Sequence, residues 1–115
     1  MAKLTIAQRR EAQLDRFTRD YIGDADKARH IINTYYRYVA LNYRVFLMEN
    51  DANTCNTRFC KEESEKEERA RKRLAEALKP YGLKLFTPWI TPEIAAMDET
   101  TGAVRVVAVE PILYR

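Results

Sequence analysis

The sequence predicts an α+β fold in which three helices precede a small three-stranded antiparallel sheet with a C-terminal hairpin. Hydrophobic residues recur with the period of a helix as far as Pro80, and beyond it they alternate with the two-residue period of a strand. Only three glycines and four prolines occur among the 115 residues, which favours long regular elements. A chain of this length has room for one modest core, so we expect residues 1–115 to form a single domain.

The first predicted helix spans residues 6–22. Thr5 and Gln8 have the spacing of a capping box, in which each side chain accepts a hydrogen bond from the other residue's backbone amide. Gly23 is the residue type that most often ends a helix in the left-handed conformation. The helix should pack on the next one through an apolar seam formed by Leu14, Phe17 and Tyr21.

The second predicted helix, residues 25–49, is apolar on two sides and basic on the third. One apolar arc of about 100° comprises Ala28, Ile32, Tyr35, Tyr36, Val39, Tyr43 and Phe46. A second arc comprises Ile31, Tyr38, Leu41 and Val45. A helix of this kind is either the central rod of its domain or half of a subunit interface. We expect the second arc to form a homodimer interface, because the other elements offer too little surface to cover both arcs.

Turn-forming residues at 50–57 separate this helix from a third at 58–79, which Pro80 and Gly82 end. The first half of the third helix is charged nearly all round, so we expect it to project into solvent, supported by i,i+4 ion pairs. The second half is amphipathic and should dock on the domain. Basic residues cluster where this helix leads into the sheet, namely Arg69, Arg71, Lys72, Arg73, Lys79 and Lys84.

Three strands are predicted in the last third of the chain, at residues 83–87, 94–98 and 103–109. The connection at 87–92 contains two prolines and cannot be helical. The turn between the last two strands is rich in polar residues, and Gly102 is available there for a positive φ. This pattern predicts a hairpin.

Charge is strongly segregated along the chain, although the net charge is only +3. Residues 1–48 carry a net +4, residues 49–68 a net −4, residues 69–84 a net +5 and residues 85–115 a net −2. Blocks of alternating sign suggest either docking between segments of the chain or a polarised surface for partners.

Two sets of residues, both rich in basic side chains, are the candidates for binding a partner. They are Arg29, Asn33, Arg37 and Arg44, which form a strip between the arcs of the second helix, and Arg69, Arg71, Lys72 and Arg73 on the third. Such rows commonly meet phosphates, and an acidic protein surface suits them equally well. Arginines that only cover apolar neighbours with their stems would produce the same pattern.

The element order is similar to that of a winged helix, in which a basic third helix enters the major groove and a hairpin touches the DNA backbone. Three features depart from that pattern. The second helix is far longer than such folds use, and a long loop separates it from the third helix. The hairpin tip carries Asp98 and Glu99, which repel phosphate.

Residues for catalysis or metal binding are scarce. The chain has one histidine, His30, and two cysteines, Cys55 and Cys60, whereas a structural zinc site needs four ligands. Its single serine, Ser64, lies in the charged helix, and there is no glycine-rich phosphate loop. We expect neither an enzyme nor a bound cofactor or metal. No apolar run approaches a membrane span of about 18 residues, and the chain starts without a secretory signal, so we expect a cytoplasmic protein without membrane contact.

We therefore expect a small non-enzymatic binding or regulatory protein, of the kind that phages and plasmids encode. Its partner would be nucleic acid or a nucleoprotein, met through the arginine-rich helix faces. The alternative is a protein–protein interaction module or inhibitor that acts through the second helix as a homodimer, without nucleic-acid contact. Dependence of affinity on salt separates the two, because phosphate contacts weaken steeply as ionic strength rises.

Overall fold

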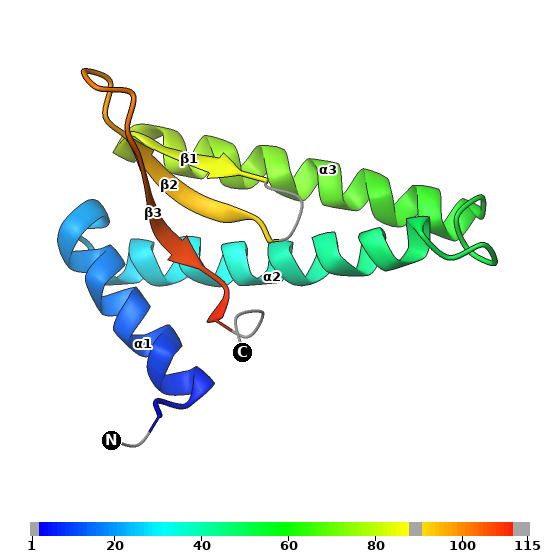
Figure 1. Ribbon diagram of the computed structural model, residues 1–115, viewed down its shortest axis with the longest axis horizontal. Coiled ribbons are helices and arrows are strands. Elements are labelled where there is room, and N and C mark those ends of the chain that lie inside the picture. The colour runs from blue at the N-terminus through cyan, green and yellow to red at the C-terminus, as the bar shows by residue number, and fades with distance from the viewer. Residues whose placement is uncertain (1–2, 88–90, 112–115) are drawn as a thin grey trace.

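Three helices precede an antiparallel sheet, in the order that the change of hydrophobic period predicts (Figure 1). The computed structural model describes residues 3–87 and 91–111. Its helices are α1 (Ile6–Phe17), α2 (Ala25–Glu49) and α3 (Arg58–Leu78), with a π-helical turn at Thr18–Ile22 and a 3₁₀ turn at Lys79–Tyr81. Its strands are β1 (Leu83–Phe86), β2 (Glu93–Met97) and β3 (Val104–Val109). The predicted α+β class is confirmed.

The helix ends follow from local capping. Thr5 and Gln8 form the capping box, in which the Thr5 hydroxyl accepts from the Gln8 amide at 3.1 Å and the Gln8 side chain accepts from the Thr5 amide at 2.8 Å. Asp24 and Thr57 start α2 and α3 by accepting a backbone amide with their side chains. Gly23 ends the first helical segment with a φ of 81°. These predicted boundaries are confirmed.

The last turn of the first helical segment is wider than the predicted α-helix. The Gly23 amide donates to the Thr18 carbonyl five residues earlier, at 2.7 Å, and the Thr18 hydroxyl donates to the Leu14 carbonyl at 2.8 Å. Tyr21 and Ile22 in this turn still pack against the core. The spacing of apolar residues is satisfied by either kind of turn, so the sequence pattern could not distinguish them.

The arc that was expected to form a dimer interface lies inside the domain. Ile31, Tyr38 and Val45 are only 5%, 1% and 2% exposed, and Leu41 is half-buried. The reason is that α3 runs alongside α2 and covers this arc (Figure 1). The first half of α3 docks rather than projecting alone into solvent, since its Glu63 is 4% exposed and bonded to α2.

The sheet lies on one side of the α2–α3 pair and has the order β1-β2-β3. Ile94 in the central strand pairs with Leu85 on one side and with Ala108 on the other. A bulge follows, because the next residue, Ala95, pairs with Val106. Figure 1 shows that the sheet covers only the half of the helical pair that contains the start of α2 and the end of α3. The predicted connection at 87–92 falls partly outside the described residues.

Helix α1 crosses α2 and is tied to the end of β3. The Gln13 side chain donates to the Tyr36 hydroxyl at 2.8 Å and accepts from the Val109 amide at 3.0 Å. Arg10 bonds to the buried carboxylate of Glu110 at 2.9 Å, and its guanidinium lies 4.7 Å from the centre of the Tyr36 ring. Both ends of the described chain thus meet at one corner of the domain. Among the described residues, no helix combines the length and apolar composition needed to cross a membrane.

Candidate partner-binding groove

A groove runs between α2 and α3 on the side of the pair that faces away from the sheet. Its cavity has a volume of about 360 Å³. Tyr35 faces the sheet, where its hydroxyl donates to the Pro92 carbonyl at 2.5 Å. Arg37 lies two residues further along α2, or about 200° around the helix axis, and lines the groove. The lining consists of His30, Ile31, Thr34, Arg37, Tyr38 and Leu41 from α2 and Ala70, Arg73 and Ala77 from α3.

The groove brings together one arginine from each predicted basic set. Arg37 comes from the strip on the second helix and Arg73 from the cluster on the third, and both side chains are exposed. Neither forms a hydrogen bond or an ion pair with any other residue that the structure describes. Two solvated guanidinium groups on opposite walls therefore remain available to an anion.

Two other members of the strip are engaged within the chain. Arg29 lies 3.8 Å from the carboxylate of Glu11 on α1. Arg44 donates to Glu63, which also accepts from Lys66 at 3.2 Å. The hydrogen bond from Lys66 and then the bond from Arg44 hold the pKa of Glu63 below its ordinary value, although desolvation opposes them. The strip is thus not one continuous binding surface.

Asn33, the remaining member of the strip, is exposed on α2. It lies four residues before Arg37 and so on the same side of the helix, next to the groove rather than in its lining. It can extend the polar rim of the groove with an amide that both donates and accepts.

The basic cluster on α3 is also divided. Arg71 bonds to Glu68 through two nitrogens, which lowers the pKa of that carboxyl group. Arg69 and Lys72 are exposed, and helical geometry puts them within an arc of about 100° that includes Arg73. These two residues continue the cationic rim of the groove along the outer side of α3, whereas Arg71 lies on the other side of the helix.

The floor of the groove is apolar and uncharged. Tyr38 lies there with its hydroxyl 3.4 Å from the Glu67 carboxylate. Burial and the nearby negative charge of Glu67 raise the pKa of Tyr38 to about 12, so the phenol is neutral at physiological pH. Ala70 and Ala77 form the α3 side of the floor. They lie seven residues apart on one face of the helix, and their small side chains leave the space that a larger residue would fill.

The floor residues were not recognised in the sequence as part of a binding site. Ile31, Tyr38 and Leu41 were assigned to a subunit interface, and the two alanines to docking of the third helix. The repeated alanines are the signal that could have indicated a groove, because small residues on one helix face leave a hollow against the neighbouring helix.

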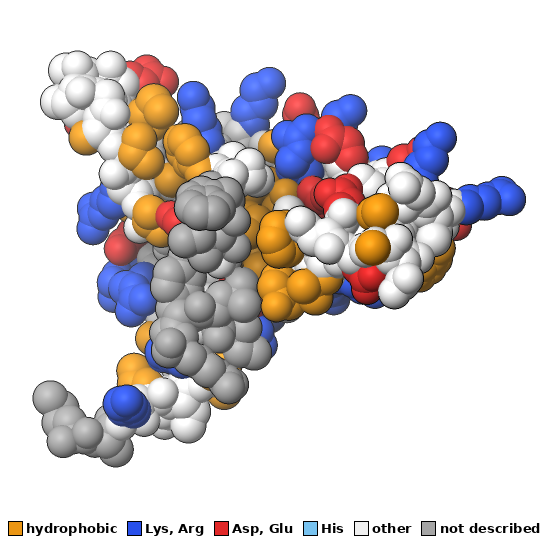
Figure 2. Space-filling model, turned by 45° about the vertical axis from the view of Figure 1, so that its right-hand side comes forward, with side chains coloured by type: hydrophobic (Ala, Val, Ile, Leu, Met, Phe, Trp, Pro, Cys, Tyr) orange, Lys and Arg blue, Asp and Glu red, His pale blue; other side chains and the backbone are white. Residues whose placement is uncertain are grey.

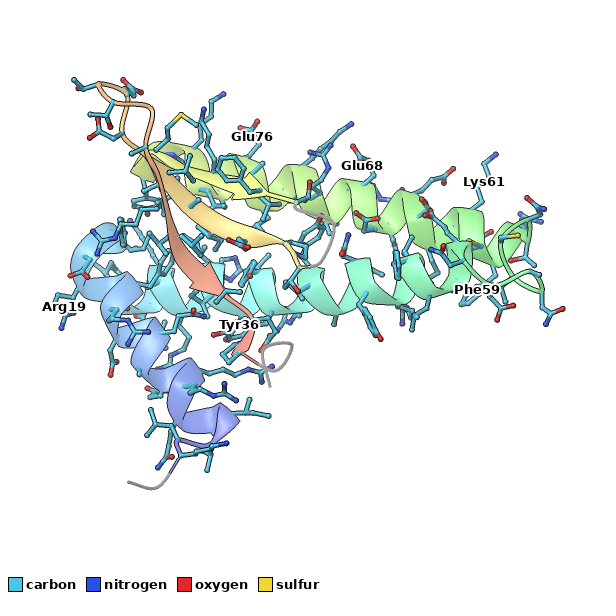
Figure 3. All side chains as sticks on the ribbon, in the orientation of Figure 1. Arg19, Tyr36, Phe59, Lys61, Glu68 and Glu76 are labelled. Carbon is cyan, nitrogen blue, oxygen red and sulfur yellow. The ribbon has the colours of Figure 1, made fainter. Side chains whose placement is uncertain are left out.

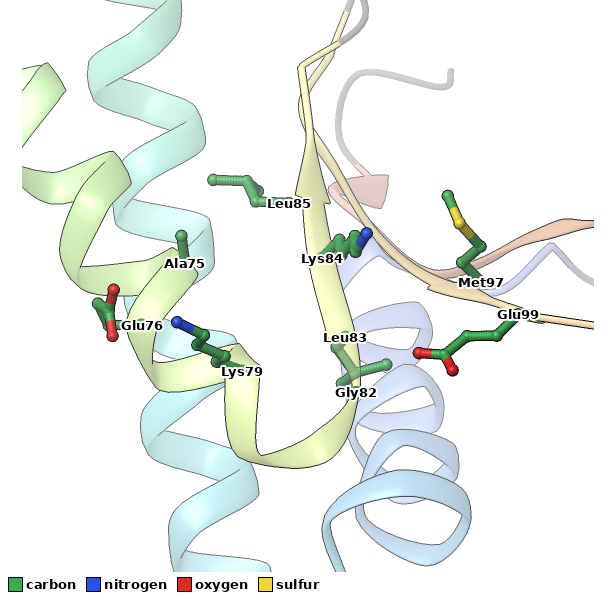
Figure 4. A pocket seen from close by; sticks show the side chains of 9 residues that line it. All are labelled: Ala75, Glu76, Lys79, Gly82, Leu83, Lys84, Leu85, Met97 and Glu99. Atoms are coloured by element: carbon green, nitrogen blue, oxygen red, sulfur yellow. The ribbon is translucent and has the colours of Figure 1, made fainter. Parts of the chain in front are cut away.

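A second cavity, of about 450 Å³, lies between the end of α3 and β1 (Figure 4). Its charged residues are two lysines and two glutamates, Lys79, Lys84, Glu76 and Glu99. Figure 4 shows Lys84 on the side of β1 that faces away from the helix. The balanced charge gives this cavity no preference for an anionic or a cationic ligand.

The histidine and the two cysteines lie in different parts of the fold, at the start of α2, in the loop after α2 and at the start of α3. The part of the chain that the structure describes contains no cluster of three histidine, cysteine, aspartate or glutamate side chains that could hold a metal. His30 is exposed at the edge of the groove. Cys60 is buried near the start of α3, and desolvation raises the pKa of its thiol. Comparisons with protein families, with curated proteins and with solved structures found no match.

Proposed function

We propose that this is a non-enzymatic binding protein that holds an acidic segment of a partner protein in the groove between α2 and α3. The observation that carries the proposal is the pair Arg37 and Arg73, which lie on opposite walls of one apolar-floored groove and have no partner among the described residues. Guanidinium groups bind carboxylates with two parallel hydrogen bonds, so each wall can hold one acidic side chain.

The apolar floor favours a protein partner over nucleic acid. Leu41, Ala70 and Ala77, which are half-buried, offer hydrophobic contact below the level of the arginines. An amphipathic helix with acidic residues beside its apolar face would use both features, as helix-in-groove complexes do. A phosphate backbone would meet only the rim and leave the floor without a ligand.

Nucleic acid is the second candidate, and one observation favours it. Arg69 and Lys72 continue the exposed cationic rim along α3, which lengthens the row of charges that phosphates could contact. Binding through such a row would weaken steeply with rising salt concentration.

Charge reversal in the groove tests the proposal. The variant Arg37→Glu/Arg73→Glu should lose partners that wild-type protein captures from extracts of its native host, because both walls then repel carboxylates. The matched control is Arg19→Glu/Arg58→Glu, which makes the same change in charge at exposed arginines outside the groove. Figure 3 shows Arg19 on the outer side of the first helical segment.

The capture experiment is performed with and without nuclease. A nuclease-resistant partner that is lost only in the groove variant supports an acidic protein segment. A partner that nuclease removes supports the nucleic-acid candidate instead. Equal capture by wild type, groove variant and control would show that the groove arginines are an ordinary solvated face.

A further inference from the structure

The single histidine of the chain lies in the groove between α2 and α3. His30 is exposed on α2 and lines the same cavity as Arg37 and Arg73. Among the residues that the structure describes, its imidazole ring has no hydrogen-bond or ion-pair partner, and the Thr34 hydroxyl donates to its backbone carbonyl instead. Both ring nitrogens are therefore available to a ligand in the groove.

His30 and Arg37 lie on the same side of α2. They are seven residues apart, which corresponds to about 10.5 Å along the helix axis and falls within about 20° of two full turns. Ile31 and Tyr38, the floor residues beside them, repeat with the same spacing. A helical ligand that lies along the groove can therefore face both His30 and Arg37 with acidic residues seven positions apart.

Arg73 lies on the opposite wall, at a level between these two residues. The contacts of Arg44 with Glu63 and of Tyr38 with Glu67 show that α2 and α3 run in opposite directions. Arg73 is six residues beyond Glu67, or about 9 Å further along α3. It is therefore level with the part of α2 that comes about two turns before Tyr38, between His30 and Arg37. The three side chains form a triangle around one stretch of the groove.

The groove lining carries no acidic side chain to neutralise this triangle. Figure 2 shows a different arrangement along the face of α3 drawn there, where Lys and Arg side chains lie among Asp and Glu side chains. Glu67, at the floor of the groove, is bonded to the neutral phenol of Tyr38, which lies eight residues or about 12 Å along α2 from His30. The charges that share the groove with His30 are thus cationic.

The other charges near this end of α2 occur in pairs of opposite sign. They are Asp26 and Lys27 one turn before His30, Arg29 with Glu11 of α1, Arg19 with Asp20 in the preceding π-helical turn, and Glu76 with Lys79 in the cavity on the other side of α3. These pairs leave the two groove arginines as the unbalanced charges on the described walls around His30. Carboxylates that enter the groove supply the negative charge that favours a protonated imidazole ring.

We propose that His30 is a third, proton-dependent anion contact of the groove, so that the protein holds an acidic segment more tightly below neutral pH. Histidine is the side chain that ordinarily changes its charge between about pH 5 and pH 8. Glutamates of the ligand stay ionised down to about pH 4.3, and arginine stays charged throughout. Acidification therefore adds a cation to the groove without removing the charges it meets. This inference rests on the proposed function, because it concerns the same groove and the same acidic ligand.

The test uses a synthetic probe in place of the natural partner. The probe is a fluorescent helical peptide of about three heptads, with leucine on its apolar face and glutamate on both flanks. A peptide with glutamine in place of every glutamate is the control. Wild-type protein should bind the glutamate peptide about two- to fivefold more tightly at about pH 5.5 than at about pH 7.5. The glutamine peptide should show no such increase.

Two substitutions separate the charge of His30 from other effects of pH. His30→Gln cannot take up a proton and should bind the glutamate peptide at both pH values with the neutral-pH affinity of the wild type. His30→Lys is charged at both pH values and should bind tightly at both. Because His30 is exposed on a helix, both variants should fold, which circular dichroism checks.

The proton itself can be followed because the chain has one histidine. The ring resonances of that histidine need no further assignment in NMR spectra. The pH at the midpoint of their titration should rise when the glutamate peptide is bound. Addition of the peptide should not move this midpoint in Arg37→Glu/Arg73→Glu, since that groove repels carboxylates.

The outcomes distinguish this inference from the proposed function. Equal affinity of the wild type at both pH values, with binding lost in Arg37→Glu/Arg73→Glu, would overturn the role of His30 and leave the proposed function in place. A wild-type protein that binds the glutamate peptide at neither pH contradicts the proposed function, and this inference with it. An increase in acid that persists in His30→Gln would assign the proton to another group and overturn the inference alone.

Discussion

Arg44 on α2 donates a hydrogen bond to the buried carboxylate of Glu63 on α3. This contact joins the two helices in the half that the sheet does not cover, and Lys66 of α3 donates to the same carboxylate. A buried carboxylate is stable there only because two cations satisfy it. The pair explains why a segment that is charged nearly all round docks along its neighbour.

The bridge at Glu63 makes stability depend on pH. In the folded state the pKa of Glu63 is lowered from its ordinary value of 4.5. At pH values above 4.5 the ionised carboxylate therefore stabilises the fold. The contribution is lost as the pH falls through the lower folded pKa. Glu63→Gln should therefore be less stable than wild type at neutral pH, and the difference should disappear in acid.

Chemical denaturation at a series of pH values measures this effect. Glu65→Gln, at an exposed position two residues along the helix, is the control and should follow the wild-type curve. A Glu63→Gln variant whose stability differs from wild type by the same amount at all pH values would contradict the prediction.

The hydroxyl of Tyr35 is a buried link between α2 and the sheet. It donates to the Pro92 carbonyl at 2.5 Å, and desolvation raises the pKa of the phenol far above its ordinary value. Tyr35→Phe should cost about 1–2 kcal/mol in the free energy of unfolding, because it leaves a buried carbonyl without its donor. Tyr43→Phe, at an exposed position, should change nothing. Equal effects of the two variants would rule out the link.

The depth of the groove depends on Ala70 and Ala77. Replacing both with leucine should fill the floor and abolish partner capture, while stability changes by less than about 1 kcal/mol because the positions open to solvent. Ala75→Leu enlarges an alanine that lines the other side of α3 and should leave capture intact. If Ala70→Leu/Ala77→Leu still captures the partner fully, binding does not use the floor.

The two cysteines should differ in reactivity. Cys60 is buried and its thiol pKa is raised, mainly by desolvation, whereas Cys55 is half-buried in the loop between α2 and α3. Iodoacetamide requires the thiolate, so Cys55 should be alkylated faster in the folded protein. Mass spectrometry of Cys55→Ser and Cys60→Ser measures each thiol separately. Equal rates in the folded state and in denaturant would show that burial does not protect Cys60.

Much of the fold could be predicted from local sequence signals. The capping residues Thr5, Asp24 and Thr57 and the left-handed Gly23 fix helix ends through hydrogen bonds with near neighbours, so short patterns report them. Gly102 has a φ of 73° in the predicted hairpin turn. The strands begin and end within one residue of their expected limits, because alternation of apolar residues directly reflects a sheet with a buried face.

The candidate site could be predicted only in part. The sequence identified Arg37 and Arg73 as basic candidates but not that they line one groove, because helix pairing depends on contacts between distant segments. The sequence pattern also led us to expect that the arc containing Ile31 and Tyr38 would contact a second copy of the chain. The charges around Glu63 suggested a solvated helix. Nothing in the neighbouring sequence indicated that Glu63 would be buried and would accept a hydrogen bond from Arg44 of α2.

The tie between α1 and β3 sets an order for folding. Arg10 and Glu110 are separated by 100 positions, and Gln13 and Val109 by 96. Contacts this distant form only after nearly the whole chain has left the ribosome, whereas α2 and α3 are joined by a short loop and can pair much sooner. We expect the first helix to meet α2 early through its apolar seam and to be fixed in its final place late, when the end of β3 arrives to bond with Gln13 and Arg10.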